Sequence, residues 1–358
     1  MVKGRERTHL WKLAIALCIW SACCGAASAA ETSACVAHDS ETKSVVDMAG
    51  RNVVLPRHVN RIATVGSVPV LNGFLFALGA GEKIVNSLPP RFTQSNRWRL
   101  QTAIAPYLSD RPVLQGQVSS EVSLETLVEL SPDVVVTMNL LGVRALETAK
   151  IPVVYLEWAD ASDIRKNMKI LGCVVDRMPR SEDYLRYFDA TMDRVRLTLE
   201  GVANNSPPKA LYFNPDSMTT PLLIANWWIK EAGGVSVTAA MASGGNARFS
   251  HEQVLAWNPD ILIVNTPEQV AVVYQDERFS KINAVRNKKV YATPIGAHSW
   301  GQRTIEQPLT VLWAAKLFHP ELFEQLDMEN EVRTFYRRFF TYELSDEDIR
   351  SILTGGEG

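Results

Sequence analysis

The residues best suited to binding chemistry are concentrated in one stretch, residues 296–303, which reads Gly-Ala-His-Ser-Trp-Gly-Gln-Arg. His298 offers a nitrogen that can ligate a metal, Trp300 offers a flat face for stacking, and Arg303 carries a fixed positive charge. The glycines leave room for a bound molecule. This combination favours recognition of an aromatic or anionic ligand over catalysis.

A site for a bare metal ion has little support. Beyond residue 29 the chain has five histidines, and none forms a close pair with another histidine or a cysteine. A site built from distant residues stays open, with His298 as its candidate ligand. A metal already wrapped in an organic chelator needs less, because aromatic faces contact the chelator and arginines bind its negative oxygens. The tryptophans and arginines of the chain, Trp158, Trp300, Arg248 and Arg303, therefore fit a metal chelate better than a bare ion.

Catalytic motifs are missing from the sequence. It has no Gly-x-Ser-x-Gly elbow, no phosphate-binding glycine loop and no spaced pair of nucleophile and base. Ser299 and His298 are neighbours, and adjacent side chains rarely face each other. A metal-dependent enzyme and an exported sensory or adhesion protein are the less favoured alternatives, and no intrinsic cofactor is expected.

Two further candidates, Glu125 and Glu252, belong to a phrase that the chain carries twice, 127 residues apart. In each copy a serine stands two residues before the glutamate, and a Pro-Asp pair and an apolar run follow. Each copy predicts a short helix, a stop at proline and a buried strand. Ser123 and Ser250 are expected to cap these helices, which puts each glutamate in an exposed first turn. An acid there also suits the helix dipole, whatever its partner.

Strand and helix patterns alternate from Arg61 onward, which predicts parallel sheets covered by helices. A helical pattern over residues 181–200, capped by Ser181, would be about 30 Å long and could join two lobes as a strut. The expected fold is α/β, with two Rossmann-like lobes joined by one long rigid helix. The expected divisions are a signal peptide at 1–29, a flexible lead at 30–44, an N-terminal lobe at 45–160, a helical segment at 161–204 and a C-terminal lobe at 205–354.

In open α/β lobes, ligands bind beyond the carboxyl ends of the strands. The candidate ligand-binding residues are the polar, aromatic, cationic and thioether side chains of those segments: Ser67, Arg91, Met138, Asn139, Trp158, Asn214, Met218, Arg248, His298, Trp300 and Arg303. Arg91 shares an irregular segment with Arg97, Trp98 and Arg99. That segment either rims the cleft or is solvated surface.

The first 29 residues have the basic start, the apolar stretch and the small-residue end of a secretory signal peptide. A retained membrane anchor and lipidation at Cys23 or Cys24 are the alternatives. The formal charge of the chain is −2 and no long basic run occurs, which argues against a nucleic-acid partner. We expect an exported, periplasmic protein that meets the membrane only through a partner or a lipid anchor.

Only two cysteines, Cys35 and Cys173, follow the predicted signal peptide. An exported protein can join two such residues in an oxidising compartment. Alternatively, Cys173 is a buried thiol, because it lies in an apolar run. The sequence leaves both readings open.

At the repeated phrase, over residues 124–136 and 252–263, the chain resembles the solute-binding proteins of ABC importers for ferric siderophores, haem and cobalamin. The resemblance extends from about Val45 onward and includes an opening hairpin at 45–55 and the long linking helix. It implies two α/β lobes that open and close only slightly. It also implies that Glu125 and Glu252 pair with arginines of a membrane permease, which works with an ATPase.

Residues and resemblance together predict a binding protein that captures a metal chelate, foremost a ferric siderophore, and presents it to an ABC permease. Haem ranks lower because no tyrosine or histidine has the context of an axial ligand, although Tyr212 and His298 keep it open. Cobalamin and a nickel or cobalt complex are further alternatives.

Overall fold

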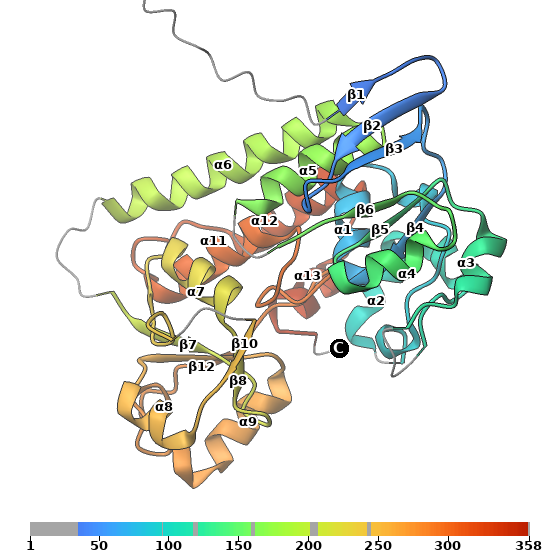
Figure 1. Ribbon diagram of the computed structural model, residues 1–358. Helices are drawn as coiled ribbons and strands as arrows, with labels where there is room; N and C mark the ends of the chain where they lie inside the picture. The colour runs from blue at the N-terminus through green and yellow to red at the C-terminus, as the bar shows by residue number, and fades with distance from the viewer. Residues whose placement is uncertain are drawn as a thin grey trace, which may run out of the picture. The chain divides into compact units, whose positions relative to one another are not determined.

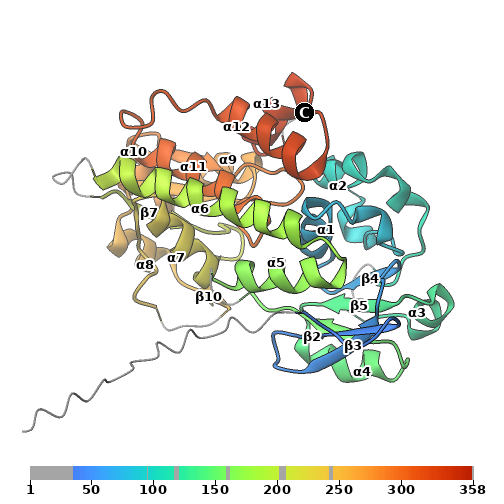
Figure 2. The same ribbon diagram turned by 90° about the horizontal axis from the view of Figure 1, so that it is seen from above.

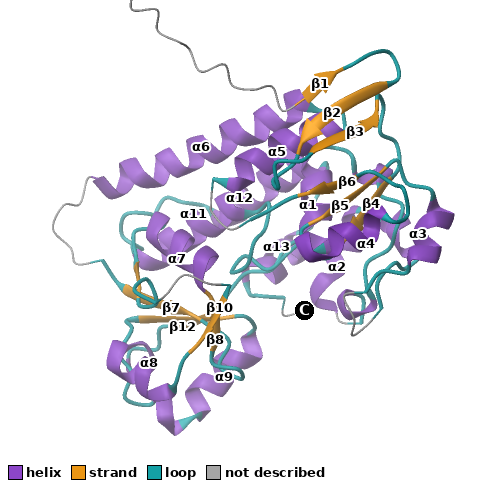
Figure 3. Cartoon of the chain, viewed as in Figure 1, coloured by secondary structure: helices purple, strands orange, loops and turns teal. Residues whose placement is uncertain are grey.

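The computed structural model describes residues 35–94, 96–116, 121–158, 162–200, 207–241 and 245–356. The predicted signal peptide at 1–29, with the lipidation alternatives, lies outside these residues. The described part contains two parallel sheets, one in each half of the chain, and Figure 3 shows their strands among the helices. The predicted α/β class is confirmed.

The first parallel sheet has the order β4-β5-β6, and every residue of its strands is buried. Buried β-branched runs need cover on both faces, which helices supply. Ile84 makes only a single parallel bridge to Ile62 at the edge of this sheet. The strands and helices of this half are β4 (Ile62–Val65), α1 (Val68–Ala77), α2 (Arg99–Ile104), α3 (Leu124–Leu130), β5 (Val134–Thr137), α4 (Val143–Glu147) and β6 (Val153–Tyr155).

The second parallel sheet has the order β12-β11-β7-β9, and Figure 1 labels its strands β7 and β12. Its central strand β11 is again wholly buried and apolar. The elements of this half are β7 (Lys209–Tyr212), β8 (Thr219–Pro221), α7 (Leu222–Glu231), β9 (Val235–Ser236), β10 (Asn246–Arg248), α8 (His251–Trp257), β11 (Ile261–Val264), α9 (Pro267–Gln275), α10 (Asn283–Arg286) and β12 (Val290–Ala292). Strands β8 and β10 form a separate antiparallel pair. The lobe boundaries drawn from the sequence stay predictions.

The repeated phrase builds the same unit in both sheets. Ser123 and Ser250 each accept a hydrogen bond from the backbone N–H three residues later, at 3.2 and 3.3 Å, and so cap α3 and α8. The strands that follow, β5 and β11, lie inside their sheets. Asp133 and Asp260 each accept a backbone N–H at the start of the neighbouring strand, β4 or β7. The predicted serine caps are confirmed, and the aspartates of the phrase tie adjacent strands together.

The long helix α6 spans Met178–Glu200 and begins before the predicted cap. Because Pro179 is compatible with the first positions of a helix, α6 can begin before Ser181. Ser181 is therefore not a cap but a buried residue of the first turn. Helix α6 packs along α5 (Asp163–Val174), as Figure 2 shows. Gly172 permits this approach, since a Cβ there would lie 2.8 Å from the Cβ of Ser181.

Helix α6 contacts both halves of the chain, as the predicted strut requires. It meets α1 on one side and α7 and α11 on the other. Arg180 donates to the carbonyl of Ala77 at 3.2 Å and to that of Phe339 at 3.0 Å. The C-terminal helices are α11 (Gln307–Phe318), α12 (Met328–Phe335), a π-helix (Tyr336–Phe340) and α13 (Asp346–Leu353). Within the described ranges, no helix combines the length and apolar character needed to cross a membrane.

A small antiparallel sheet precedes the first parallel sheet and is formed by β1 (Cys35–Ala37), β2 (Thr42–Val46) and β3 (Asn52–Pro56). The predicted opening hairpin is confirmed as β2 and β3. The flexible lead expected at 30–44 is wrong for its described part, because β1 pairs with β2. A disulfide between Cys35 and Cys173 also anchors this segment to α5. The thiols are thus paired, and the alternative of a free buried Cys173 is excluded.

Replacing both Cys35 and Cys173 with serine is expected to lower the free energy of unfolding by about 3–5 kcal/mol. The disulfide joins residues 138 positions apart, so it restricts a long loop of the unfolded chain. Urea unfolding with and without a reductant measures the effect. The reductant should destabilise the wild-type protein and leave the double variant unchanged. Equal urea midpoints for the wild-type protein and the double variant without reductant would contradict the expectation.

Candidate functional site

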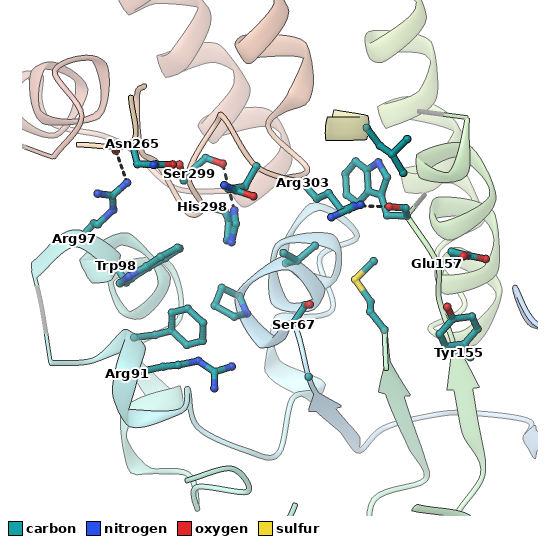
Figure 4. A pocket seen from close by; sticks show the side chains of 18 residues that line it. Ser67, Arg91, Arg97, Trp98, Tyr155, Glu157, Asn265, His298, Ser299 and Arg303 are labelled. Carbon is teal, nitrogen blue, oxygen red and sulfur yellow. Dashed lines mark hydrogen bonds between the residues drawn. The ribbon is translucent and has the colours of Figure 1, made fainter. Parts of the chain in front are cut away.

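A cavity of about 690 Å³ is lined by residues from both halves of the chain (Figure 4). Its size falls within the range of about 300–1,000 Å³ that is usual for small-molecule sites. The lining includes the carboxyl ends of the parallel strands, at Gly66 after β4, Met138 after β5, Tyr155 in β6 and Asn265 after β11. This position agrees with the general rule for open α/β sheets.

Arg91, Phe92, Arg97 and Trp98 of the irregular segment form one wall of the cavity. Arg97 donates to the backbone carbonyl of Asn265 at 2.6 Å and so reaches the C-terminal half of the chain. The ring of Trp98 lies 5.0 Å from the ring of His298 and 5.0 Å from that of Phe92. The guanidinium of Arg91 lies 4.7 Å from the centre of the Phe92 ring. Of the two readings of this segment, the structure supports the cleft rim.

The start of α1 forms a second part of the lining. Gly66 adopts a left-handed backbone conformation, with φ at 88°, which turns the chain from β4 into the helix. Ser67 is the N-cap residue, and its side chain makes no capping hydrogen bond. Pro69 and Val70 complete this part of the wall. The helix start presents the positive end of its dipole at the cavity.

The loop 296–301, named the ligand loop from here on, supplies His298 and Ser299 to the cavity. Only glycine fits at its two ends. A Cβ at Gly296 would overlap Glu306 Oε1 and Tyr336 Oη, and a Cβ at Gly301 would overlap the ring of Tyr212. The glycines were expected to leave space for a ligand, but they admit neighbouring protein side chains instead.

The cavity carries more positive than negative charge. Arg91, Arg97 and Arg303 line it, whereas Glu157 is the single acid among the described residues that do so. Arg97 and Arg303 donate to the backbone carbonyls of Asn265 and Trp158. Burial lowers the pKa of both guanidinium groups, but arginine stays charged in proteins.

None of these three arginines forms an ion pair with any carboxylate that the structure describes. Glu268 raises the pKa of Arg97 at longer range and does not line the cavity. Figure 4 shows Arg97 and Arg303 on different sides of the space, with Ser67 between them in the view. A ligand with negative oxygens would therefore meet charged donors without competing acids.

His298 is neutral near pH 7. Burial lowers its pKa to about 4, and the nearby charge of Arg97 acts in the same direction. Its Nδ1 lies 3.3 Å from the carbonyl oxygen of Ser299, so the tautomer with hydrogen on Nδ1 can donate there. Among the described residues, no group of three or more His, Cys, Asp or Glu side chains is arranged to hold a metal ion. The His298 ring lies beside the Trp98 ring in the lining of the cavity.

The predicted ligand-binding residues divide into those that line the cavity and those that do not. The residues that line it are Ser67, Arg91, Met138, Trp158, His298 and Arg303. The side chain of Trp158 is almost fully buried and packs 5.4 Å from the ring of Phe74, so it forms a fixed wall.

The other five predictions are not placed at the cavity. Trp300 is fully buried, and its indole N–H donates to a carboxylate inside the core. Met218 belongs to the core of the second sheet. Asn214 and Asn139 accept backbone N–H groups of their own turns. Arg248 is exposed on β10. These side chains bond to local turns, pack in the core or face solvent. The spacing of residues in the sequence could not predict these positions.

Several lining residues escaped the sequence reasoning. Asn265 directly follows β11, and Tyr155 ends β6, so the carboxyl-end rule could have identified both. Gln302 lines the cavity and donates to the Tyr212 hydroxyl at 3.1 Å. Leu223, at the start of α7, had no signal, because an apolar residue of a helix is expected to pack in the core.

Glu125 and Glu252 lie in the first turns of α3 and α8, and both are exposed. Hydrogen bonds from the Ser250 side chain and from its own backbone lower the pKa of Glu252. Neither glutamate lines the cavity. The repeat therefore presents two equivalent acids on the surface, one from each half of the chain.

A family model described as periplasmic binding protein matches residues 105–295. The molybdate-binding protein MolA of Haemophilus influenzae is 25% identical over an alignment of 327 residues, and the match covers 83% of this chain and 90% of that protein. The iron(3+)-hydroxamate-binding protein YxeB of Bacillus subtilis is 24% identical over 204 residues, which are 57% of this chain and 58% of that protein.

Solved structures agree with this likeness. The crystal structure of a periplasmic solute binding protein from Veillonella parvula superimposes with a TM-score of 0.75 at 26% identity. The match covers 87% of this chain and 97% of that one. The likeness therefore extends over both halves of the chain.

Proposed function

The chain belongs to the periplasmic binding protein family, and on this premise we propose that it captures an anionic metal chelate, foremost a ferric siderophore, for delivery to its permease. As a member of this family it is the substrate-binding protein of an ABC importer and not an enzyme. The observation that carries the ligand proposal is the set of three arginines, with no carboxylate partner among the described residues, in a cavity with aromatic walls.

The cavity suits a chelate in size and in chemistry. At about 690 Å³ it has room for many water molecules, each of which takes about 30 Å³ in the liquid. A single small oxyanion would displace only a few of them. Phe92, Trp98 and Trp158 offer faces for an organic chelator, and Arg97 and Arg303 offer forked donors for its negative oxygens. The relative YxeB, an iron(3+)-hydroxamate-binding protein, supports a metal chelate as the ligand.

A free oxyanion is the second candidate. The relative MolA binds molybdate and matches most of this chain. Arginine donors and a helix start suit an oxyanion as well as a chelate. Haem, cobalamin and a nickel or cobalt complex are the remaining alternatives, and they differ from a ferric siderophore in charge and shape.

Delivery requires contact with the permease, and Glu125 and Glu252 are the proposed docking residues. They are exposed, equivalent by the repeat, and carried by different halves of the chain. Arginines of the permease are their proposed partners, and its ATPase would drive release. The proposed location is the periplasm, reached through the signal peptide or with a lipid anchor. No nucleic-acid partner is proposed.

The ligand can be identified by titrating the purified protein with a ferric tris-catecholate siderophore, a ferric hydroxamate, haem, cobalamin, nickel–histidine and molybdate. Tryptophan fluorescence should be quenched by the ferric siderophores, because Trp98 lines the cavity. Trp98→Phe should lose most of the response. Trp257→Phe is the matched control, since Trp257 packs on Phe249 away from the cavity. Quenching by molybdate alone would favour the second candidate, and silence with every compound would contradict the ligand proposal.

A further inference from the structure

Glu306 is a fully buried carboxylate that lies behind the ligand loop and does not line the cavity. It follows the loop by a few residues and stands just before α11. Burying an ionisable acid is costly unless its oxygens are satisfied. Its contacts show what it does in the fold.

Both oxygens of Glu306 accept hydrogen bonds, mostly from the ligand loop itself. Oε2 accepts the backbone N–H of His298 at 2.9 Å, and Oε1 accepts the indole N–H of Trp300 at 3.1 Å. Oε1 also accepts the hydroxyl of Tyr336 at 2.7 Å, and that hydroxyl in turn accepts the backbone N–H of Ala297 at 2.8 Å. One carboxylate therefore holds three consecutive parts of the loop, directly or through Tyr336.

The cavity side of the loop depends on this arrangement. His298, whose backbone N–H donates to Glu306, and the next residue, Ser299, both line the cavity. From the N-terminal half, Gln101 donates to the carbonyl of Ala297 at 2.7 Å, so the loop is held from both halves. Gly296 is required here because any side chain would collide with Glu306 and Tyr336.

We infer that Glu306 is a positioning residue for ligand capture: as a carboxylate it fixes the ligand loop, and its protonation loosens the loop and weakens binding. The inference rests on the proposed function only in taking this cavity as the ligand site. Four groups donate towards the two oxygens, and the fourth is the Thr304 hydroxyl at 3.4 Å. An added proton on either oxygen would face a donor, so at least one of these bonds must be lost.

Among the described residues that face Glu306, none carries a positive charge. Tyr336 from the π-helix and Tyr184 from α6 are its titratable neighbours, and His298 stands on the loop. Asp348 of α13 acts on Tyr336 and is paired with Arg99 at 2.6 Å. Burial raises the pKa of Glu306 to about 7, against the effect of its hydrogen bonds, of which that from Tyr336 is the largest. The carboxylate can therefore change its charge within the range of pH that a periplasm meets.

The change has two opposite consequences. Burial makes the folded protein hold the Glu306 proton to a higher pH than the unfolded chain does. The contribution of Glu306 to the free energy of unfolding therefore falls as pH rises from its ordinary pKa of 4.5 through about 7. Over the same range the loop gains hydrogen bonds. A residue with a merely structural role would not separate global stability from loop order in this way.

The test is the pH dependence of the Trp300 indole N–H resonance in the full-length mature protein without ligand. In the wild-type protein it should move with a midpoint near pH 7, since the acceptor becomes charged. Glu306→Gln should abolish the transition, and Tyr336→Phe should shift its midpoint upward. The matched control is Glu324→Gln, because Glu324 is an exposed acid. In this variant the Trp300 resonance should show the same pH transition as in the wild-type protein. An unchanged transition in Glu306→Gln would overturn the inference.

Hydrogen exchange over residues 294–303, corrected for the intrinsic rate, measures the protection of the His298 backbone amide. This measurement needs no substitution of a tryptophan. Exchange should be slower above pH 7 than below it, and it should become faster in Glu306→Gln at pH 8. Affinity for a ferric tris-catecholate siderophore and for molybdate should fall about tenfold in Glu306→Gln, as for loss of one charge-assisted hydrogen bond. If neither compound binds the wild-type protein, the ligand proposal fails while resonance and exchange still decide the role of Glu306. Equal exchange in both proteins would overturn it.

Discussion

Replacing Glu125 and Glu252 together with lysine is expected to abolish uptake of the bound ligand into cells while its affinity for the protein stays unchanged. Both acids are exposed in first helical turns, and neither lines the cavity. Reversing them would place like charges against the proposed arginines of the permease, which costs several kcal/mol at an interface. Uptake should therefore fall by about a hundredfold or more.

The measurement is uptake of ferric siderophore by cells that produce the variant in place of the wild-type protein. A matched control reverses two other exposed acids, Glu182 and Glu324, and should leave uptake intact. Each single variant should be impaired less than the double one, because one docking point remains. Normal uptake by the double variant at equal protein levels would rule out the docking assignment.

Replacing Arg97 and Arg303 together with alanine is expected to weaken binding of an anionic chelate by about a hundredfold or more. Each arginine contributes a charge-assisted donor in a partly buried place, where such bonds are worth about 1.5–3 kcal/mol. Neither has a carboxylate partner among the described residues, so its charge is available to the ligand. A neutral or cationic ligand should lose far less affinity.

The control for this variant is Arg248→Ala, because the structure places Arg248 on β10, exposed and away from the cavity. Its affinity for the ferric tris-catecholate siderophore, measured by calorimetry, should equal that of the wild type. Arg97→Lys and Arg303→Lys should give intermediate losses, since lysine keeps the charge but not the fork. Full affinity of the double alanine variant would refute an anionic ligand held by these arginines.

Much of the fold could be predicted from local pattern. The apolar runs of β5 and β11, the serine caps and the Pro-Asp stops are short-range signals, and the structure has them at the predicted places. Predictions were wrong where contacts between residues distant in the sequence determine the local structure. Cys35 looked like part of a loose polar lead, yet strand pairing and the disulfide to Cys173 order it. Ser181 looked like a cap, yet α6 begins earlier and buries it against α5.

The candidate site could be predicted only in part. The rule about carboxyl strand ends correctly indicated Ser67, Met138 and Trp158, because a parallel sheet brings those ends together. It could not rank the members of one loop. His298 faces the cavity, whereas Trp300, two residues later, packs in the core on Glu306.

Local signals predict that one helix–strand unit occurs twice and that Glu125 and Glu252 lie in the first turns of equivalent helices, because caps and apolar runs act over a few residues. The contact of Arg97 in one half with Asn265 in the other, and the bond from the His298 backbone to the buried Glu306, are visible only in the folded chain. Those relations depend on packing between segments far apart in the chain. No local pattern encodes them, since the same side chain is surface, core or binding site according to what is folded against it.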